Sequence, residues 1–558
     1  MSTEWNTVSG AGSAPGDIAD DGWQLFFGYR DEESFASTVE QLAADRVGSG
    51  IAGRNPALWG PDAEAEAGKR LAWVGLPEES RPLVPQIEQL RDRLNAAGLD
   101  HVVLCGMGGS SLAPEVICRT HGVELTVVDS SDPDYVRAAL ADRLERTIVV
   151  VSSKSGSTVE TDSQRRVYEK ALSDAGRDPK DHLVIVTDAG SPLDESARAD
   201  GYTVFNADPD VGGRYSALTA FGLVPSGLAG ADIGRLLDEA AAIQPALEAD
   251  DLDNPGLRLG ALLGVANVGG ADKAVLAEHH SGLVGFGDWA EQLIAESTGK
   301  NGRGILPVVV PDVTAPNFDP STSDEVLVTL GEPDGAPPAS GWGASVHAPL
   351  GAAMLLWEYA VPVAGRLIGI NPFDQPDVES AKQAARDMLE GGGQQPDPVF
   401  TDGAVEVFAT DGLLDGQQSV AEAVESLLGR IDDQHGYLAV MAYLDRRRNA
   451  HLAHVREGLA AQTGRPTTFG WGPRFLHSTG QYHKGGAPTG VFLQITAEPR
   501  EDLEIPGRPF TFGQFIKAQA IGDASVLASK GRPVLRLHLT EQTAGFDVLR
   551  TSLGKGLR

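Results

Sequence analysis

Two short segments rich in glycine and hydroxyl side chains carry the clearest chemical signal in this chain. Each follows an apolar run typical of a buried strand and precedes a segment typical of a helix. The first turn contains Gly108, Gly109 and Ser110, and the second contains Ser153, Lys154, Ser155 and Thr158. Glycine lets backbone N–H groups approach an anion, hydroxyls add hydrogen-bond donors, and a helix N-terminus favours negative charge. Both turns are therefore suited to binding an anion.

The two turns fit a single phosphate group better than a nucleotide. Neither contains GxxxxGK[ST], and Gly106-Met107-Gly108-Gly109 lacks the GxGxxG spacing. Taken singly, each turn can also be an ordinary tight connection between a strand and a helix. Two such turns on one parallel sheet lie side by side at the carboxyl ends of their strands. Together, and with the cation of Lys154 at the rim, they predict a phosphate cradle.

Arg214 and Glu296 are candidates for the reaction itself. Arg214 follows a Gly–Gly pair just after the fifth apolar run, where a guanidinium can reach a site and stabilise a developing oxyanion. Glu296 lies in the last turn of a predicted helix that stops at Gly299. A carboxylate there opposes the helix dipole, which raises its proton affinity and suits a general base. Taken alone, a glutamate at such a position is more often a surface residue.

Two polar segments later in the chain add further candidates. Gln375 precedes a predicted helix that carries Lys382 seven residues later, so the two side chains can lie along one line. A solvated polar helix start explains that pair equally well. His477 and His483 lie in the polar segment HSTGQYHKGG, which has no cysteine or carboxylate at ligand spacing. Acid–base or phosphate chemistry is therefore favoured there over metal binding.

Composition limits the class of protein and its partners. The chain has 558 residues, enough for two to four domains, and its 41% hydrophobic and 22% charged residues are ordinary for a globular protein. A net charge of -33 argues against nucleic acid and anionic membranes as partners, and reflects either salt adaptation or simple solubility. We find no secretory signal and no apolar run of about 18 residues. Cys105 and Cys118 are expected to be buried thiols, so we predict a cytoplasmic protein.

The alternation of apolar runs and amphipathic segments predicts an α/β fold. Apolar runs at 102–104, 125–128, 148–151, 183–186 and 202–205, with helical patterns between them, predict a doubly wound parallel sheet. A second alternating region follows. We predict an acidic tail and helical segment at 1–98, a first sheet domain at 99–230, a helical connection carrying Glu296 at 231–300, and a second, rearranged domain with a C-terminal extension at 301–558.

Five ordered motifs resemble the glucose-6-phosphate isomerase family, which is built of sugar isomerase (SIS) domains. They lie between about residue 100 and residue 390 and read GMGGSS, SSKSGSTVET, GGRYSALTAFGLVP, AESTGKNGRGILPV and LGAAMLLWEYAVPVAGRLIGINPFDQPDVESAK. The likeness is greatest to the isomerase half of bifunctional transaldolase–isomerase fusions, which share HSTGQYHKGG. The roughly 100 residues before His101 are too few for a transaldolase (β/α)₈ barrel.

The resemblance implies an activity and a role for each candidate. The family interconverts glucose 6-phosphate and fructose 6-phosphate through a cis-enediol(ate), without a cofactor or metal, and acts as a homodimer whose histidine crosses from the neighbouring subunit. It implies that Glu296 moves the proton between C1 and C2, and that Arg214 stabilises the enediolate. The remaining roles fall to two groups: phosphate binding by Ser110, Ser153, Lys154, Ser155 and Thr158, and sugar contact with help in ring opening by Gln375 and Lys382.

One departure from the family pattern concerns the ring-opening histidine. The family's GQH motif is absent between Glu296 and Leu350, and the segment at 478–483 resembles the missing piece. The histidine is then supplied from after residue 470, as either His477 or His483. Two other functions stay open: a phosphosugar-binding sensor on the same fold, and a dual phosphoglucose/phosphomannose isomerase. The presence of Arg214, Glu296 and Lys382 together favours an enzyme, because sensing needs only the cradle.

Overall fold

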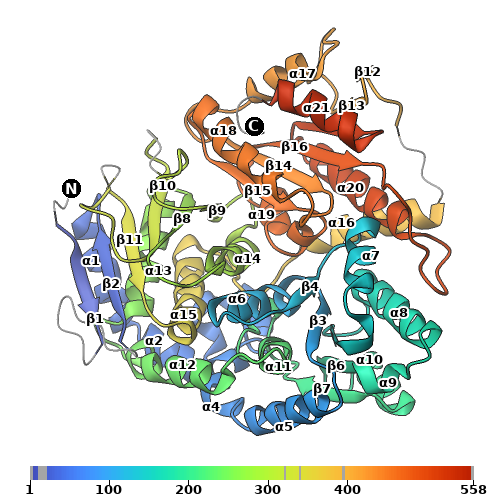
Figure 1. The fold of residues 1–558 in the computed structure, drawn as a ribbon. Helices are drawn as coiled ribbons and strands as arrows, with labels where there is room; N and C mark the ends of the chain where they lie inside the picture. Colours follow the sequence, from blue (N-terminus) through green and yellow to red (C-terminus); the bar gives the residue numbers. More distant parts are fainter. Residues whose placement is uncertain (1–3, 11–21, 319–321, 339–340, 392–395, 554–558) are drawn as a thin grey trace.

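A computed structural model of the chain describes residues 4–10, 22–318, 322–338, 341–391 and 396–553. Within the helix at 378–391, the side chains at 378–379, 381–382 and 390–391 lie outside this description. The described chain contains three β-sheets built around parallel strands and flanked by helices (Figure 1). The predicted α/β class with parallel sheets is confirmed, but the structure has three sheets where we expected two.

The first sheet is entirely parallel, with the order β4-β3-β5-β6-β7. Its strands are β3 (His101–Gly106), β4 (Thr126–Val128), β5 (Thr147–Ser152), β6 (Leu183–Asp188) and β7 (Thr203–Ala207). The helices of this unit are α6 (Leu112–Thr120), α7 (Pro133–Ala141), α8 (Val159–Asp174), α9 (Pro179–His182), α10 (Pro192–Asp200) and α11 (Ala220–Leu228). Every residue of β3 and β5 is buried, as expected for strands covered on both faces. The strand order reverses between β3 and β5, where such sheets bind ligands.

The second sheet has the order β1-β2-β11-β10-β8-β9 and combines strands from residues 6–28 with strands from residues 273–347. Its strands are β1 (Asn6–Ser9), β2 (Gln24–Gly28), β8 (Lys273–His279), β9 (Leu306–Val310), β10 (Glu325–Gly331) and β11 (Gly343–His347). β8 to β11 are parallel, whereas β2 pairs antiparallel with β11. The principal helices of this unit are α12 (Ile233–Glu248), α13 (Pro255–Val268), α14 (Phe286–Thr298) and α15 (Leu350–Ile368). The parallel part of this sheet therefore begins at β8, inside the region that we expected to be a helical connection.

The third sheet occupies the C-terminal part, with the order β12-β13-β17-β16-β14-β15. Its strands are β12 (Phe400–Asp402), β13 (Val405–Ala409), β14 (Tyr437–Tyr443), β15 (Thr467–Trp471), β16 (Gly490–Ala497) and β17 (Val534–Leu539). The accompanying helices are α16 (Val378–Gly391), α17 (Val420–Leu428), α18 (Val455–Thr463), α19 (Gly480–Gly485), α20 (Phe512–Ser529) and α21 (Gln542–Ser552). Residues 301–558, which we expected to form one rearranged domain, therefore contribute to two sheets. Strand patterns in a sequence do not reveal which strands pair, because pairing partners lie far apart along the chain.

The N-terminal region is mostly helical, as expected, but it is not a separate layer. Its helices are α1 (Glu32–Ala44), α2 (Val47–Ala52), α3 (Pro61–Ala67), α4 (Leu76–Glu79) and α5 (Leu83–Ala96). They share one hydrophobic core with the first and second sheets, and α15 lies inside this core. Nearly all of α15 is buried, which explains why its sequence is apolar on every side. Within the described residues, no helix combines the length and apolarity needed to span a membrane.

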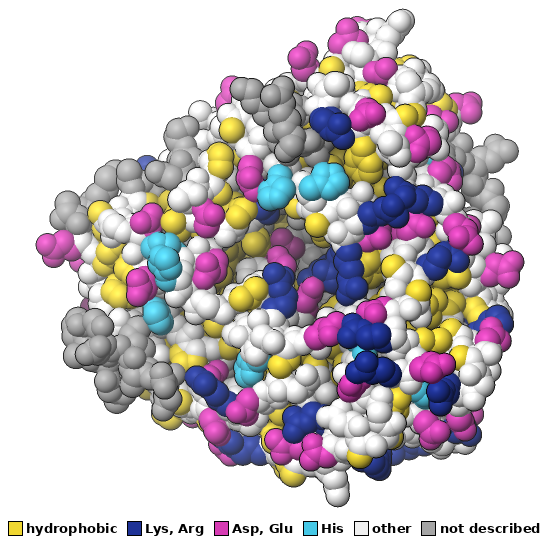
Figure 2. All heavy atoms as spheres, viewed as in Figure 1, with side chains coloured by type: hydrophobic (Ala, Val, Ile, Leu, Met, Phe, Trp, Pro, Cys, Tyr) yellow, Lys and Arg dark blue, Asp and Glu magenta, His cyan; other side chains and the backbone are white. Residues whose placement is uncertain are grey.

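The third unit has a core of its own and meets the second unit across a shared apolar cluster. Figure 2 shows a face that is hollowed near its middle, where α14 meets the third unit, with acidic and basic side chains interspersed around the hollow. Although the net charge of the chain is -33, basic side chains therefore lie around this hollow.

Candidate active site

The first Gly/Ser turn follows β3 and lies where several segments meet. It forms a short 3-10 turn, η3 (Gly108–Ser110). A Cβ atom on Gly109 would lie 1.9 Å from the carbonyl oxygen of Gly213, in the loop after β7. A Cβ atom on Gly108, whose φ is +56°, would lie 2.9 Å from both the Gln292 Nε2 atom and the His477 carbonyl oxygen. Only glycine permits these approaches, so the turn brings α14, the third unit and the loop after β7 together.

The second turn, between β5 and α8, presents free donors beside the first. The Ser153 hydroxyl accepts a hydrogen bond from the Gly156 N–H at 3.1 Å, which shapes the turn. Thr158 is the N-cap residue of α8, but its side chain does not cap the helix. Neither the Thr158 nor the Ser110 hydroxyl makes a hydrogen bond with the described residues. Ser155 is exposed, and its hydroxyl contacts that of Ser157 at 2.6 Å. The Thr158 and Ser110 hydroxyls are therefore free to receive an anion.

Lys154 occupies a different place from the one we expected. Its Nζ donates to the carbonyl oxygens of Pro209 and Val211 at 3.0 and 2.9 Å, and forms an ion pair with Asp188 at 2.8 Å. The ammonium therefore ties the turn to the ends of β6 and β7 instead of ending free at the rim. Asp188 largely compensates the charge of the ammonium. In this conformation Lys154 therefore stabilises the turn from the side that faces β6 and β7.

Arg214 is buried at the centre of the site. It lies in η5 (Gly213–Tyr215), directly after β7, and is only 4% exposed. Its Nη2 donates to the carbonyl oxygens of Pro372 and Asp374 at 2.7 and 3.1 Å. Its Nη1 donates to the Gln375 side-chain oxygen at 3.0 Å and lies 3.4 Å from a Glu296 carboxylate oxygen. The guanidinium thus joins the first sheet, the turn before α16 and the candidate base.

Glu296 lies in the last turn of α14 and is 5% exposed. Burial raises the pKa of its carboxyl group, whereas the nearby Arg214 guanidinium opposes that rise. The Gln292 side chain, one turn earlier, donates to the second carboxylate oxygen at 3.4 Å. A carboxylate with raised proton affinity, held between two donors, can accept and return a proton.

His477 completes the group from the third unit. It ends η7 (Arg474–His477), and its Nε2 lies 3.1 Å from a carboxylate oxygen of Glu160, in the first turn of α8. The Gln519 side chain donates to the same oxygen at 2.7 Å. The His477 carbonyl oxygen accepts from Gln292 at 2.8 Å, which connects the histidine to the helix of Glu296. Glu160 therefore fixes the imidazole over the second turn.

The two candidate histidines have different surroundings. Within the single chain of the structure, His477 contacts Glu160. His483 is buried inside the third unit, where Nδ1 lies 3.0 Å from the Tyr437 hydroxyl and the ring stacks on that of Tyr437. Burial lowers the pKa of His483 to about 3, so its ring is neutral. Of the two histidines, only His477 lies with the other candidates.

Lys300, which follows the end of α14, was not among the residues predicted from the sequence. Its Nζ is buried and donates to the carbonyl oxygens of Asn371 and Asp374 and to the Asp374 carboxylate, at 2.6 to 2.7 Å. Burial lowers the pKa of Lys300 to about 8, and the adjacent Arg214 charge acts in the same direction. Lys300 therefore anchors the turn that presents Gln375. The signal that could have identified Lys300 from the sequence is its position in AESTGKNGRGILPV, one of the motifs that resemble the family.

Gln375 and Lys382 complete the predicted set. Gln375 is itself exposed, but its oxygen accepts from Arg214, so it lies at the mouth of the group. Lys382 lies on α16, and its side chain is outside the described part of the structure.

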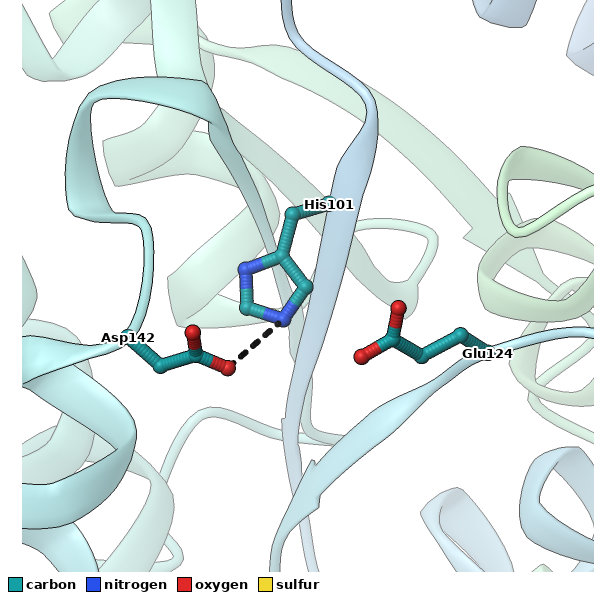
Figure 3. Close-up of side chains that lie close together, drawn as sticks. All are labelled: His101, Glu124 and Asp142. Atoms are coloured by element: carbon teal, nitrogen blue, oxygen red, sulfur yellow. Dashed lines mark ion pairs between the residues drawn. The ribbon is translucent and has the colours of Figure 1, made fainter.

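One cluster elsewhere has the residue types of a metal site. His101, Glu124 and Asp142 place their potential ligand atoms within 4.8 Å of one another, at the amino end of β3 (Figure 3). However, Arg143 forms ion pairs with both carboxylates, and the two His101 ring nitrogens lie 2.9 and 3.1 Å from threonine hydroxyls. A guanidinium already supplies the positive charge there, so these residues fit an ion-pair cluster better than a metal site.

Sequence comparisons show which known proteins the chain resembles. A family profile described as Phosphoglucose isomerase matches residues 93–305. A probable glucose-6-phosphate isomerase from Natronomonas pharaonis is 30% identical over 369 residues, which cover 58% of this chain and 85% of that protein. A second probable glucose-6-phosphate isomerase, from Methanococcus maripaludis, is 27% identical over 347 residues, which cover 52% of this chain and 79% of that protein.

Solved structures share the fold. A hypothetical protein, TT0462, from Thermus thermophilus superposes with a TM-score of 0.55 at 25% identity, covering 65% of this chain and 99% of that one. A glucose-6-phosphate isomerase from Chlamydia trachomatis superposes with a TM-score of 0.54 at 21% identity, covering 68% and 90%. Because a relative at 30% identity is covered over most of its length, the chain belongs to the phosphoglucose isomerase family of enzymes.

Proposed function

We propose that the chain catalyses the interconversion of glucose 6-phosphate and fructose 6-phosphate through a cis-enediol(ate). The observation that carries this proposal is the buried Glu296 carboxylate, 3.4 Å from the Arg214 guanidinium and adjacent to an open set of anion donors. A sensor needs only the donors. A buried base with a cation beside it costs stability and supports a chemical role.

The proposed reaction begins with the phosphate of the substrate in the cradle formed by the two turns. Its oxygens accept hydrogen bonds from the Ser110 and Thr158 hydroxyls. Binding at this end uses the non-reacting part of the substrate to hold C1 and C2 near Glu296. Ser153 and Lys154 support the shape of the second turn.

Glu296 then carries out the proton transfer. Its carboxylate removes the proton from C2 of the open-chain aldose, and the electron pair moves to the C1 oxygen to form the enediolate. The same carboxylic acid returns the proton to C1, while a proton moves from the C2 hydroxyl to the C1 oxygen, which leaves the ketose. Arg214 stabilises the negative charge of the enediolate, because its guanidinium already lies beside the carboxylate.

Ring opening must precede this step, since the sugars exist mainly as closed rings. We assign it to His477, whose Nε2 is directed to Glu160, so that Nδ1 can exchange a proton with the sugar. Gln375 and Lys382 are proposed to contact the sugar, as the family resemblance implies. Lys300 acts indirectly, by fixing the turn before α16.

The proposed site is self-contained within one chain, because the third unit supplies His477. A homodimer, which the family resemblance implies, would then carry two independent sites. We further propose that the protein acts in the cytoplasm, where its two buried, unpaired cysteines are stable as thiols.

A coupled assay tests the function. Purified protein is incubated with fructose 6-phosphate, and glucose 6-phosphate is detected by an NADP-dependent glucose-6-phosphate dehydrogenase. Turnover within the usual range of metabolic enzymes, about 1–10³ per second, is expected. The same assay started with mannose 6-phosphate distinguishes a dual isomerase, because only such an enzyme forms glucose 6-phosphate from it by way of fructose 6-phosphate. Absence of turnover in a folded protein that still binds phosphosugar would favour the sensor instead.

A further inference from the structure

A second pocket lies in the third unit, away from the residues described above. Its volume is about 570 Å³, and it is bounded by α20, by the end of β13 with the loop that follows, and by the beginning of β17. Apolar side chains such as Phe408, Leu413 and Ile521 form part of its wall. Its charged lining residues are Arg430, Arg532, Arg536 and Asp411. The lining therefore carries a net charge of +2, in a chain whose overall net charge is -33.

Arg536 is the unusual member of this group. It lies on β17 and is only 4% exposed, yet its guanidinium makes no hydrogen bond or ion pair with any described residue. Its planar group lies over the Phe408 ring, with the guanidinium carbon 3.8 Å from the ring centroid. Burial lowers the pKa of Arg536 to about 10, so the group is still charged at neutral pH. The acidic residue that acts on it electrostatically is Glu406, which does not pair with it.

A buried charge without a partner is costly, and proteins normally pair it. The stacking on Phe408 orients the plane of the guanidinium but satisfies none of its five N–H donors. Since Arg536 lines the pocket, those donors are available to a molecule inside it.

The two other arginines reach the same space. Arg532 is 6% exposed; one terminal nitrogen donates to the Gly486 carbonyl oxygen at 3.0 Å, while its Nε has no partner among the described residues. Arg430 lies at the exposed side and donates to the Gly412 carbonyl oxygen at 2.6 Å. Both guanidinium groups are held in place by backbone carbonyls and keep donors to spare.

We propose that this pocket binds a small organic dianion, a phosphate monoester with an apolar body. Guanidinium groups match the oxygens of phosphate in a bidentate fashion, which suits Arg536 and Arg532. A dianion would balance the net charge of the lining, and the apolar wall would pack against the body of the ligand. This site is separate from the cradle between β3 and β5, and it does not depend on the proposed isomerase activity.

The test uses 4-bromophenyl phosphate with the full-length protein. Crystals grown or soaked with the probe are expected to show a bromine anomalous peak in the pocket beside Arg536, distinct from any peak in the cradle. In solution, calorimetric titration is expected to require two classes of site in the wild type. The pocket class should weaken by at least about tenfold in Arg536→Met, the scale of losing one charge-assisted contact.

Control variants separate this loss from a general effect of charge or folding. Arg550→Met removes an exposed arginine of the same unit and should leave both classes unchanged. Arg430→Met, at the exposed mouth, should weaken the pocket class even if Arg536→Met does not fold. Inhibition of isomerisation by the probe reports on the cradle and should be the same in all variants. The proposal is overturned if bromine is found only in the cradle, or if both Arg430→Met and Arg536→Met bind the probe as the wild type does.

Discussion

Replacing Glu296 by glutamine tests the proposed mechanism most directly. Glutamine has nearly the same shape, so the packing of α14 should be kept. Its oxygen can still accept from Arg214, which also retains the carbonyl oxygens of Pro372 and Asp374 as partners. Its NH₂ group would face the Gln292 donor, and the long 3.4 Å contact there would be lost. The expected cost in stability is about 1 kcal/mol, the usual value of one hydrogen bond.

The effect on catalysis should be far larger, because an amide cannot accept a proton. General base catalysis contributes about 10²–10⁴ in rate, so kcat should fall by about 10³-fold, which corresponds to about 4 kcal/mol in the barrier. The Michaelis constant should change little, since the phosphate donors are untouched.

The coupled assay gives kcat and KM, and thermal unfolding checks the fold. Glu291→Gln is a matched control on the same helix. Burial raises the pKa of Glu291 to about 8, so its carboxyl group is mostly protonated at neutral pH and resembles the amide already. This control should retain activity. If Glu296→Gln keeps more than about a tenth of the wild-type kcat, Glu296 is not the base that the rate requires.

The raised pKa of Glu296 predicts how the activity depends on pH. Burial raises the pKa of Glu296 above the ordinary glutamate value of 4.5. The carboxylate form is the active one, so kcat/KM should fall as the pH drops through this raised pKa. The acid limb of the profile should therefore lie above pH 4.5, and a limb at or below the ordinary value would contradict the assignment.

Three further predictions concern the histidines and the cradle. His477→Ala should lower kcat by about 10²-fold, the scale of an acid–base group, whereas His483→Phe should keep it; the reverse order would exchange their roles. Mixing inactive Glu296→Gln and His477→Ala chains, with subunit exchange verified by mass, should restore no activity, while recovered turnover would show that sites are shared. Thr158→Val should raise KM by about tenfold with little change in kcat, as expected for one hydrogen bond to a charged group, and Thr158→Ser should not; equal KM values in all three proteins would remove Thr158 from the cradle.

Local sequence patterns were sufficient to predict the first sheet. Its five strands coincide with the predicted apolar runs to within two residues, because parallel strands buried on both faces are continuous apolar segments bounded by turns. The second and third sheets were not separated by the same reasoning. β2 pairs with β11 across more than 300 residues of chain, and no local pattern records such a partner.

The two Gly/Ser turns and the place of Glu296 at a helix end were predictable for a related reason. Gly/Ser turns and the end of α14 are local features, and their chemistry follows from the backbone groups that a turn or a helix end exposes. The environment of Lys154 was not predictable, since its amine is directed to Asp188 and to the loop after β7 by the packing of three strands. Lys300 was overlooked because its partners lie about seventy residues later in the chain.

What the sequence by itself determined was the chemistry available: two donor-rich turns, an arginine behind a glycine pair, a glutamate at a helix end and a histidine-bearing segment near the C-terminus. What only the tertiary structure decided was which of these groups meet. His477 and His483 are six residues apart in one polar segment, yet one lies against Glu160 and the other is buried against Tyr437. The reason is physical: the residue type sets what a side chain can do, whereas the packing of distant segments sets its neighbours, its burial and therefore its charge.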